Sequence, residues 1–237
     1  MNLILLTDQD FVSDHSVLLK DHRAKHIFEI HKAEPGRQLK VGMMGGLIGQ
    51  GTVVEIVQEE GSYQAELSVE FSLQSPEKLP LTVVLALPRP KMLRRIIQNL
   101  TALGVRHLVL INSYRVEKSY WQSPFLNQLD EYIQLGLEQA VDTVPMTIQL
   151  EKRFKPFVED HLPELVANQK AIVAHPYVEN ECPRNLSEPF VLAIGPEGGF
   201  IEYEVNKLVE AGFQPVTLGS RIQTVETVLP QLIGRLY

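Results

Sequence analysis

The chain has 237 residues, of which 44% are hydrophobic and 22% are charged, and its net charge is −7. This is the composition of an ordinary globular protein, which excludes disordered, collagen-like and coiled-coil classes. A single cysteine, Cys182, excludes an internal disulfide and a cysteine-rich zinc site. No apolar run approaches the ~18 residues of a membrane span, and the N-terminus lacks the basic flank of a signal peptide. We therefore expect a cytoplasmic protein.

The charges are unevenly distributed along the chain. Residues 81–118 hold seven lysines and arginines against one acidic residue, Glu117, whereas the segments on either side are acidic. A run of charge is often only the solvated face of a helix. It can equally be a surface that faces phosphate groups. Both interpretations remain open at this point.

The first 70 residues are rich in predicted strands. Short apolar or alternating runs are separated by turn-forming glycines, which is typical of half-buried strands. One helix, over about 22–32, interrupts them. A small closed or half-closed barrel fits this pattern. The strands are expected at 3–6, 16–19, 37–44, 51–57 and 63–71.

The pattern changes after a polar segment with two prolines, residues 72–80, which we interpret as a linker. From there strands alternate with helices, which predicts a parallel α/β sheet with helices on both faces. In the helix expected after Pro90, the apolar residues share one face, and Lys91, Arg94 and Arg95 lie on the other. Strands are expected at 81–87, 107–111, 146–150, 171–175, 190–195 and 214–219; helices are expected at 90–104, 124–139, within 153–168, at 202–211 and at the C-terminal end.

Three of the expected strand ends carry unusual sequences: AHPY at 174–177, IGPEGGF at 194–200 and LGSRIQTVET at 218–227. In parallel sheets, ligands bind beyond the carboxyl ends of the strands. Glycines there allow backbone groups to approach a ligand closely. A ligand site lined by backbone is one interpretation, and a simple turn at Gly198 and Gly199 is the other.

Several other site types are excluded or disfavoured. The chain has no nucleophile elbow of the GxSxG type, no Walker phosphate loop and no dinucleotide fingerprint. Glu197 would also repel a phosphate. His22 and His26 stand four residues apart but have no clear third ligand, so we expect no metal.

These segments together carry a resemblance. The order of a small barrel, PRPKMLRRIIQNLTALGV at 88–105, LEQAVDTVP at 137–145, IGPEGGF and LGSRIQTVET resembles the 16S ribosomal RNA uridine-N3 methyltransferase family of the SPOUT superfamily. The resemblance implies a PUA-like β-barrel over residues 1–73 that binds RNA. It also implies a SPOUT methyltransferase domain over residues 78–237, an α/β domain with a deep trefoil knot. It further implies S-adenosylmethionine as cofactor, 16S rRNA or the small ribosomal subunit as partner, and a homodimer.

The resemblance also places candidate site residues. Loss of the uridine N3 proton calls for a carboxylate base and a cationic group that stabilises the uracil anion. The catalytic candidates are Arg221, Glu197 and Glu226. The cofactor candidates are His175, Pro176, Ile194, Gly195, Pro196, Gly198, Gly199, Leu218, Gly219 and Ile222. The RNA-binding candidates are Arg89, Lys91, Arg94, Arg95 and Lys32.

The sequence departs from the family pattern on its expected RNA side. Val141 and Asp142 stand where the family has glycine and arginine, Thr224 stands where it has a second arginine, and Lys32 replaces an arginine of the barrel. An acid that faces phosphate weakens binding. The first hypothesis is therefore an rRNA (uracil-N3) methyltransferase, and the alternative is a non-catalytic or repurposed RNA- or ribosome-binding homologue.

Overall fold

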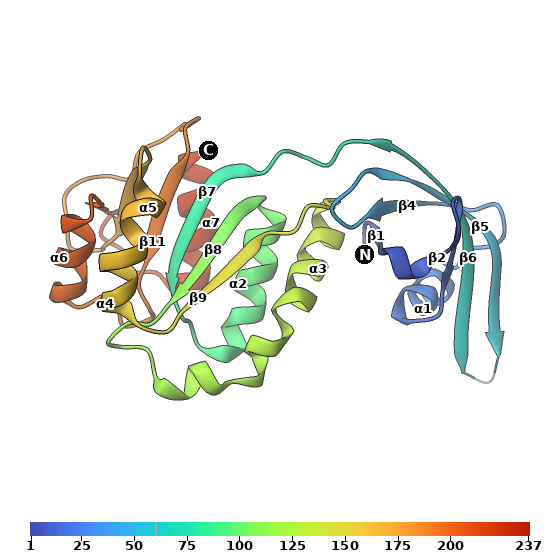
Figure 1. Cartoon of the computed structure of the whole chain (residues 1–237), viewed down its shortest axis with the longest axis horizontal. Helices are drawn as coiled ribbons and strands as arrows, with labels where there is room; N and C mark the ends of the chain where they lie inside the picture. The colour runs from blue at the N-terminus through green and yellow to red at the C-terminus, as the bar shows by residue number, and fades with distance from the viewer. Residues whose placement is uncertain (60) are drawn as a thin grey trace. The chain divides into compact units, whose positions relative to one another are not determined.

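The computed structural model describes residues 1–59 and 61–237, which form two compact units (Figure 1). Unit 1 comprises Met1–Pro76 and Gln134–Pro145. Unit 2 comprises Glu77–Ile133 and Met146–Tyr237. The second segment of unit 1 falls inside the range that the sequence assigns to the C-terminal domain. No helix within the described ranges is long and apolar enough to cross a membrane, and no cluster of metal-ligating side chains occurs among those residues.

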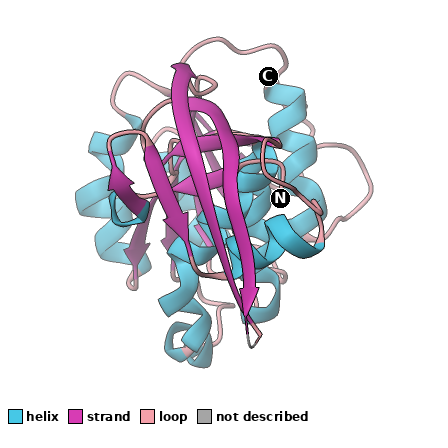
Figure 2. Cartoon of the chain, turned by 90° about the vertical axis from the view of Figure 1, so that its right-hand side faces the viewer, coloured by secondary structure: helices cyan, strands magenta, loops and turns pink. Residues whose placement is uncertain are grey.

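Unit 1 is built on a six-stranded sheet in the order β1-β4-β5-β6-β3-β2. The β1–β4 pair is parallel, and the other pairs are antiparallel. Figure 2 shows the long strands of this sheet turned toward the viewer. The five expected strands are confirmed, and β2, which follows a short 3₁₀ turn at Asp8–Asp10, was not expected. The bounds are β1 Ile4–Leu6, β2 Phe11–Ser13, β3 Ser16–Leu19, α1 His22–Glu29, β4 Gln38–Met43, β5 Ile48–Glu59 and β6 Ser62–Leu73.

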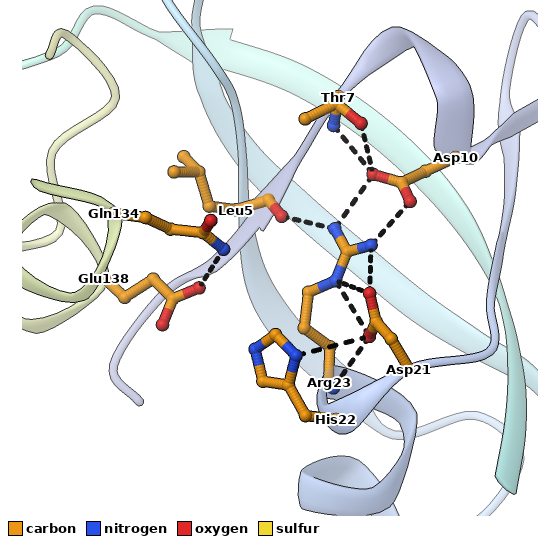
Figure 3. Close-up of polar contacts among 8 residues, drawn as sticks. All are labelled: Leu5, Thr7, Asp10, Asp21, His22, Arg23, Gln134 and Glu138. Atoms are coloured by element: carbon orange, nitrogen blue, oxygen red, sulfur yellow. Dashed lines mark hydrogen bonds and ion pairs between the residues drawn. The ribbon is translucent and has the colours of Figure 1, made fainter. Parts of the chain in front are cut away.

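The core of unit 1 contains a charged side chain, Arg23, on the inner face of α1. The Arg23 guanidinium donates to both carboxylate oxygens of Asp10, at 2.6 and 2.8 Å, and to the carbonyl of Leu5 at 2.7 Å (Figure 3). It also donates to Asp21, whose Oδ1 caps α1 by accepting from the Arg23 N–H. Burial raises the pKa of Asp10, but the bonds from Arg23 and Thr7 outweigh burial, and the net pKa is lowered. The arginine is therefore fully paired.

The segment 134–145 joins unit 1 through specific bonds. The carbonyl of Glu138 accepts the N–H groups of Asn2 and Leu3, each at 3.1 Å. Asp142 is buried, and its Oδ1 accepts from the Ser75 hydroxyl at 2.6 Å and from the Val144 N–H at 2.9 Å. The interpretation of Asp142 as an acid that faces RNA is therefore wrong, because its carboxylate is turned inward to cap a loop.

Val141 occupies the family's glycine position with a left-handed backbone, at φ +58°. This region favours glycine, and a β-branched residue there is strained. Val141 therefore adopts a backbone conformation that glycine adopts without strain. The sequence alone did not indicate this left-handed conformation.

Unit 2 is built on a six-stranded sheet in the order β12-β10-β11-β7-β8-β9, and every neighbouring pair is parallel. The predicted parallel α/β sheet is confirmed. The central strands are buried throughout β11 and over most of β7, as their continuous apolar sequences predict. The bounds are β7 Leu79–Ala86, β8 Val105–Ile111, β9 Thr147–Glu151, β10 Lys170–Ala174, β11 Phe190–Ile194 and β12 Gln214–Val216.

The helices of unit 2 follow the expected positions, and the short 3₁₀ segment η2 was not expected. In α2 the apolar side chains Leu93, Ile96, Ile97 and Leu100 are buried, as predicted. The helical stretches expected across 153–168 are confirmed: α4, the π-helical segment η4 and α5 follow one another without a gap over 154–166. The bounds are α2 Pro90–Ala102, η2 Lys118–Gln122, η3 Pro124–Gln128, α3 Leu129–Ala140, α4 Phe154–Pro156, η4 Phe157–His161, α5 Leu162–Val166, α6 Glu202–Glu210 and α7 Val225–Leu236; α3 continues from unit 2 into unit 1 at Gln134.

Helix α7 packs within the chain. Leu229, Leu232, Ile233 and Leu236 are each at most 2% exposed, and α7 packs against α2. An apolar helix of this kind could form a subunit interface, but these side chains are already covered inside one chain. Their hydrophobicity is therefore explained without a partner.

Candidate active site

Three neighbouring strands of unit 2 end at the same edge of the sheet. β12, β10 and β11 lie side by side and parallel, and they end at Val216, Ala174 and Ile194. The loops that follow them are the three segments that the sequence analysis selected. Since ligands of parallel sheets bind beyond these ends, the topology brings the three loops to one place.

A pocket lies at this edge, enclosed by the three loops and by one side of α7. All the predicted cofactor residues line it except Gly198. The wall from α7 and several loop positions were not predicted from the sequence, because a helix face that covers a pocket has the same apolar pattern as one that covers a core. The lining residues are Ala174, His175, Pro176, Ile194, Gly195, Pro196, Gly199, Val216, Thr217, Leu218, Gly219, Arg221, Ile222, Gln223, Val225, Val228 and Leu232.

The glycines of the pocket have two different roles. Gly199 and Gly219 have φ of +74° and +115°, and a Cβ on either would meet no neighbouring atom. These two are required by their backbone conformation. A Cβ on Gly195 would lie 2.7 Å from the Phe200 nitrogen, so this glycine allows the 195–200 loop to close on itself. The turn at Gly198–Gly199 therefore forms part of the pocket wall, through Gly199.

Backbone bonds hold the loops in place. The Gly199 N–H donates to the Pro196 carbonyl at 2.7 Å, and the His175 N–H donates to the Val216 carbonyl at 2.9 Å. The Thr217 hydroxyl donates to the Gly219 carbonyl at 3.0 Å and accepts from the Gly219 N–H at 3.1 Å. The loops after β11 and β12 are thus each closed by bonds of their own, and the loop after β10 is bonded to the end of β12.

His175 and Arg221 are the ionisable side chains of the lining, which also contains the polar side chains of Thr217 and Gln223. Burial lowers the pKa of His175, so its ring is neutral at pH 7. Arg221 also lines the pocket and is exposed. A neutral imidazole does not repel a cationic ligand, and Arg221 can attract an anionic one.

The three catalytic candidates are not all brought together. Arg221 lines the pocket, while Glu197 and Glu226 are absent from its lining. Glu197 Oε1 instead accepts from the Arg89 N–H at 3.1 Å and lies 3.9 Å from the Arg89 Nε. Glu226 stands in the first turn of α7.

The RNA-binding candidates lie in both units. Arg89, Lys91, Arg94 and Arg95 of unit 2 are exposed, at or near the start of α2. Lys32 of unit 1 has φ +46° and lines a shallow surface depression with His31, Glu34, Pro35 and Arg37. The basic segment of the sequence is therefore a surface, as both of its interpretations require.

The fold and the pocket define a class of protein: an α/β protein with a pocket that is built by strand-end loops of a parallel sheet and closed by the C-terminal helix. Residues 75–236 match the family of the RNA methyltransferase domain. The chain belongs to this RNA methyltransferase family, as the resemblance predicted.

Individual relatives agree with this assignment. Ribosomal RNA small subunit methyltransferase E of Treponema pallidum is 27% identical over 96% of this chain and 87% of its own. The protein named ribosomal RNA small subunit methyltransferase E 1 in Borreliella burgdorferi is 24% identical over 96% and 93%. The solved structure of the Neisseria gonorrhoeae methyltransferase E bound to S-adenosyl methionine has a TM-score of 0.71 at 21% identity, and covers 98% of this chain and 95% of its own. At that identity the likeness shows a shared fold.

Proposed function

We propose that this protein transfers the methyl group of S-adenosylmethionine to ribosomal RNA, at N3 of a uridine in 16S rRNA. The family membership and the two relatives named as small-subunit rRNA methyltransferases support the reaction class and the substrate. The observation that carries the proposal is the pocket at the ends of β10, β11 and β12, to which the chain's unusual loops contribute.

The residues of the pocket fit this cofactor. S-adenosylmethionine has a cationic sulfonium, and His175 is neutral beside its place. Apolar side chains such as Ile194, Leu218 and Ile222 suit an adenine ring, while strand-end backbone groups suit its polar edge. The related structures from Neisseria gonorrhoeae and Legionella pneumophila are described as bound to this cofactor, which supports the same assignment.

In the mechanism, this chain positions two reactants and handles one proton. The bound cofactor supplies an electrophilic methyl group. In this proposal Arg221, which lines the pocket, stabilises the negative charge that the uracil acquires when N3 loses its proton. A carboxylate must accept that proton; Glu226 is the stronger candidate, because Glu197 is already held by Arg89. The base must also be turned out of its stack to reach the pocket.

The RNA is held, in this proposal, by the exposed cations of both units. Arg89, Lys91, Arg94 and Arg95 are the contacts of unit 2, and Lys32 is the contact of unit 1. Residues 1–73 act as the PUA-like RNA-binding domain, and residues 78–237 act as the methyltransferase domain. The inward orientation of Asp142 removes one ground for a non-catalytic protein, since this acid does not confront the RNA.

The deep trefoil knot, a homodimer and a cytoplasmic location belong to the same proposal. They rest on the resemblance to the family. Light scattering tests the dimer: a mass of 26.8 kDa at micromolar concentration would be that of a single chain and would contradict it.

The decisive experiment measures the modified nucleoside. The purified protein is incubated with labelled S-adenosylmethionine and with small ribosomal subunits from a strain that lacks the protein, and the RNA nucleosides are separated by mass spectrometry. We expect 3-methyluridine to appear, and to be lost with Arg221→Ala in a protein that still binds the cofactor. A different methylated nucleoside would contradict the uridine assignment, and no transfer to any RNA would contradict the reaction.

A further inference from the structure

Tyr114 is an aromatic residue that the proposed mechanism does not use. It follows β8 at the carboxyl edge of the unit 2 sheet, and its side chain is 79% exposed, the highest value among the exposed large hydrophobic side chains. Within the part of the chain that the structure describes, its ring stacks on no other ring and its hydroxyl makes no hydrogen bond. An aromatic ring with this exposure is available to a partner that can stack on it.

The backbone beneath this exposed ring is held firmly. Glu204, in the first turn of α6, is 2% exposed and its Oε1 accepts from the Tyr114 N–H at 2.7 Å. Its Oε2 accepts from the Ser113 hydroxyl at 3.2 Å and from the Ile201 N–H at 3.0 Å. The buried Glu204 carboxylate thus fixes the backbone of the loop that carries the exposed Tyr114 side chain.

The next residue connects this loop to the candidate active site. The Arg115 guanidinium donates to the carbonyl of Gly198. Gly198 belongs to the 195–199 loop, whose Pro196 and Gly199 line the pocket. Tyr114 therefore lies on a loop that is directly bonded to one wall of the pocket.

Both cationic and acidic side chains surround the loop that carries Tyr114, and the cationic ones can still bind an anionic partner. Arg115 and Lys118 are exposed, and a guanidinium has five donors, of which the Gly198 bond uses one. Of the two nearby acids, Glu197 is held by Arg89 and Glu117 accepts from the Tyr120 hydroxyl. An anionic partner can thus approach Arg115 beside the aromatic ring.

We propose that Tyr114 and Arg115 form a nucleotide platform, in which the Tyr114 ring stacks on an unpaired base of the RNA substrate and Arg115 contacts the adjoining phosphate. An aromatic ring and a cation on one loop is the combination that binds single-stranded RNA. The inference rests on the proposed function, because it assigns a neighbour of the target nucleotide. A base that has lost its stacking partner when the target nucleotide turns out finds a new one on Tyr114.

The test compares Tyr114→Ala with Tyr114→Phe, which keeps the ring, and with Tyr203→Ala, which removes another exposed tyrosine from α6 of the same unit. The probe is an unstructured twelve-nucleotide RNA that carries 2-aminopurine, whose fluorescence is quenched by stacking. We expect Tyr114→Ala to weaken binding by about five- to a hundredfold and to abolish the quenching. Tyr114→Phe and Tyr203→Ala stay within about twofold of the unchanged protein, and cofactor affinity is the same in all.

Salt dependence separates the two residues of the platform. A stacked ring carries no charge, so Tyr114→Ala lowers affinity equally at each salt concentration. Arg115→Gln reduces the slope of log affinity against log salt by about one unit.

The outcomes distinguish this inference from the proposed function. RNA binding that is unaffected by Tyr114→Ala overturns the platform, even if the protein methylates rRNA. If the protein transfers no methyl group but its RNA binding still depends on the Tyr114 ring, the proposed function fails and the platform stands. If Tyr114→Ala weakens binding to intact small subunits but not to the RNA probe or to naked 16S rRNA, the ring contacts a protein and the platform is wrong.

Discussion

Arg23 and Asp10 form a buried ion pair in which two guanidinium nitrogens meet two carboxylate oxygens, at 2.6 and 2.8 Å. The side chains are only 9% and 10% exposed. The arginine also holds the carbonyl of Leu5 in β1, so one side chain connects the first strand, the first 3₁₀ turn and the first helix. A pair of this kind is costly to break from one side, because the remaining charge stays buried.

We predict that Asp10→Asn destabilises unit 1 by about 3 kcal/mol. The Arg23 charge would keep Asp21 as a partner but lose its second carboxylate. Hydrogen exchange of peptides from residues 1–30, together with urea unfolding, measures the loss. The control is Asp8→Asn in the same turn, whose side chain is exposed; it should change stability by less than about 0.5 kcal/mol. Equal effects of the two variants would contradict the role of the pair.

The same pair predicts the acid response. The folded pKa values of Asp10 and Asp21 are lowered: burial raises each, and the bonds and charge of Arg23 outweigh it. The two carboxylates therefore stabilise the folded protein when the pH is above their ordinary pKa of 3.8. This stabilisation is lost as the pH falls from 3.8 through the lowered pKa of the folded state. The stability difference between Asp10→Asn and the unchanged protein should narrow over this acid range.

Glu138 titrates in the opposite sense. It is 3% exposed, and burial raises its pKa above the ordinary 4.5 although Gln134 donates to it at 3.0 Å. The folded protein holds the Glu138 carboxyl proton more tightly than the unfolded chain does. The contribution of Glu138 to the free energy of unfolding therefore falls as the pH rises from 4.5 through the pKa of the folded state. We predict that Glu138→Gln stabilises the protein at pH 7 and that the gain disappears below pH 4.5, as followed by urea unfolding at each pH. Glu131→Gln, an exposed position of the same helix, should show no such pH dependence.

The sequence predicted the parts of the fold that depend on local pattern. The continuous apolar runs of β7 and β11 and the one-sided face of α2 follow from periodicity, and the parallel sheet follows from their alternation. The pocket loops were found for a related reason: their glycines and prolines interrupt that pattern at strand ends. These signals need no knowledge of distant contacts.

The parts that the sequence could not predict depend on contacts between distant residues. In the sequence Arg23 looks like an ordinary surface residue of a helix. Its burial depends on its bonds to Asp10 and to the Leu5 carbonyl, which the sequence does not reveal. Asp142 was read as a surface acid because its partner, Ser75, lies 67 residues away in the sequence. Glu204 is spaced like an ordinary helix cap, and nothing local indicates its bond to Tyr114.

Glu204 should therefore matter more to stability than its position at a helix start suggests. We predict that Glu204→Ala costs about 2–4 kcal/mol, because two backbone donors, of Tyr114 and Ile201, lose a charged acceptor. Glu202→Ala removes an exposed acid from the same first turn and should cost less than about 1 kcal/mol. Thermal unfolding measures both, and a cost for Glu204→Ala as small as that of the control would contradict this account.

The conformation of Gly219 predicts a variant that loses cofactor but keeps its fold. At φ +115° an alanine is strained by about 1–3 kcal/mol. Because a Cβ there meets no neighbour, the loop can relax without disturbing the sheet. We expect Gly219→Ala to weaken S-adenosylmethionine binding by about tenfold or more, measured by calorimetry, with an unchanged circular dichroism spectrum. Gly36→Ala, another open glycine at positive φ but in unit 1, controls for strain alone; a loss of cofactor affinity there too would contradict the site.

Because Val141 has a left-handed backbone, we expect its replacement by glycine to affect stability differently from the same replacement at the nearby Val144. A valine at φ +58° is strained by about 1–2 kcal/mol, which a glycine relieves. The substitution also removes part of the buried side chain and raises the entropy of the unfolded chain. Each of these effects lowers the free energy of unfolding by about 1 kcal/mol or less. These terms nearly cancel, so we expect Val141→Gly to leave stability unchanged or slightly increased. Val144 lies three residues further along the chain and is 37% exposed, and its φ is not positive. Val144→Gly should therefore lower the free energy of unfolding by about 1 kcal/mol or more. Urea unfolding of the two variants measures the difference, and an equal loss in both would mean that the Val141 backbone is not strained.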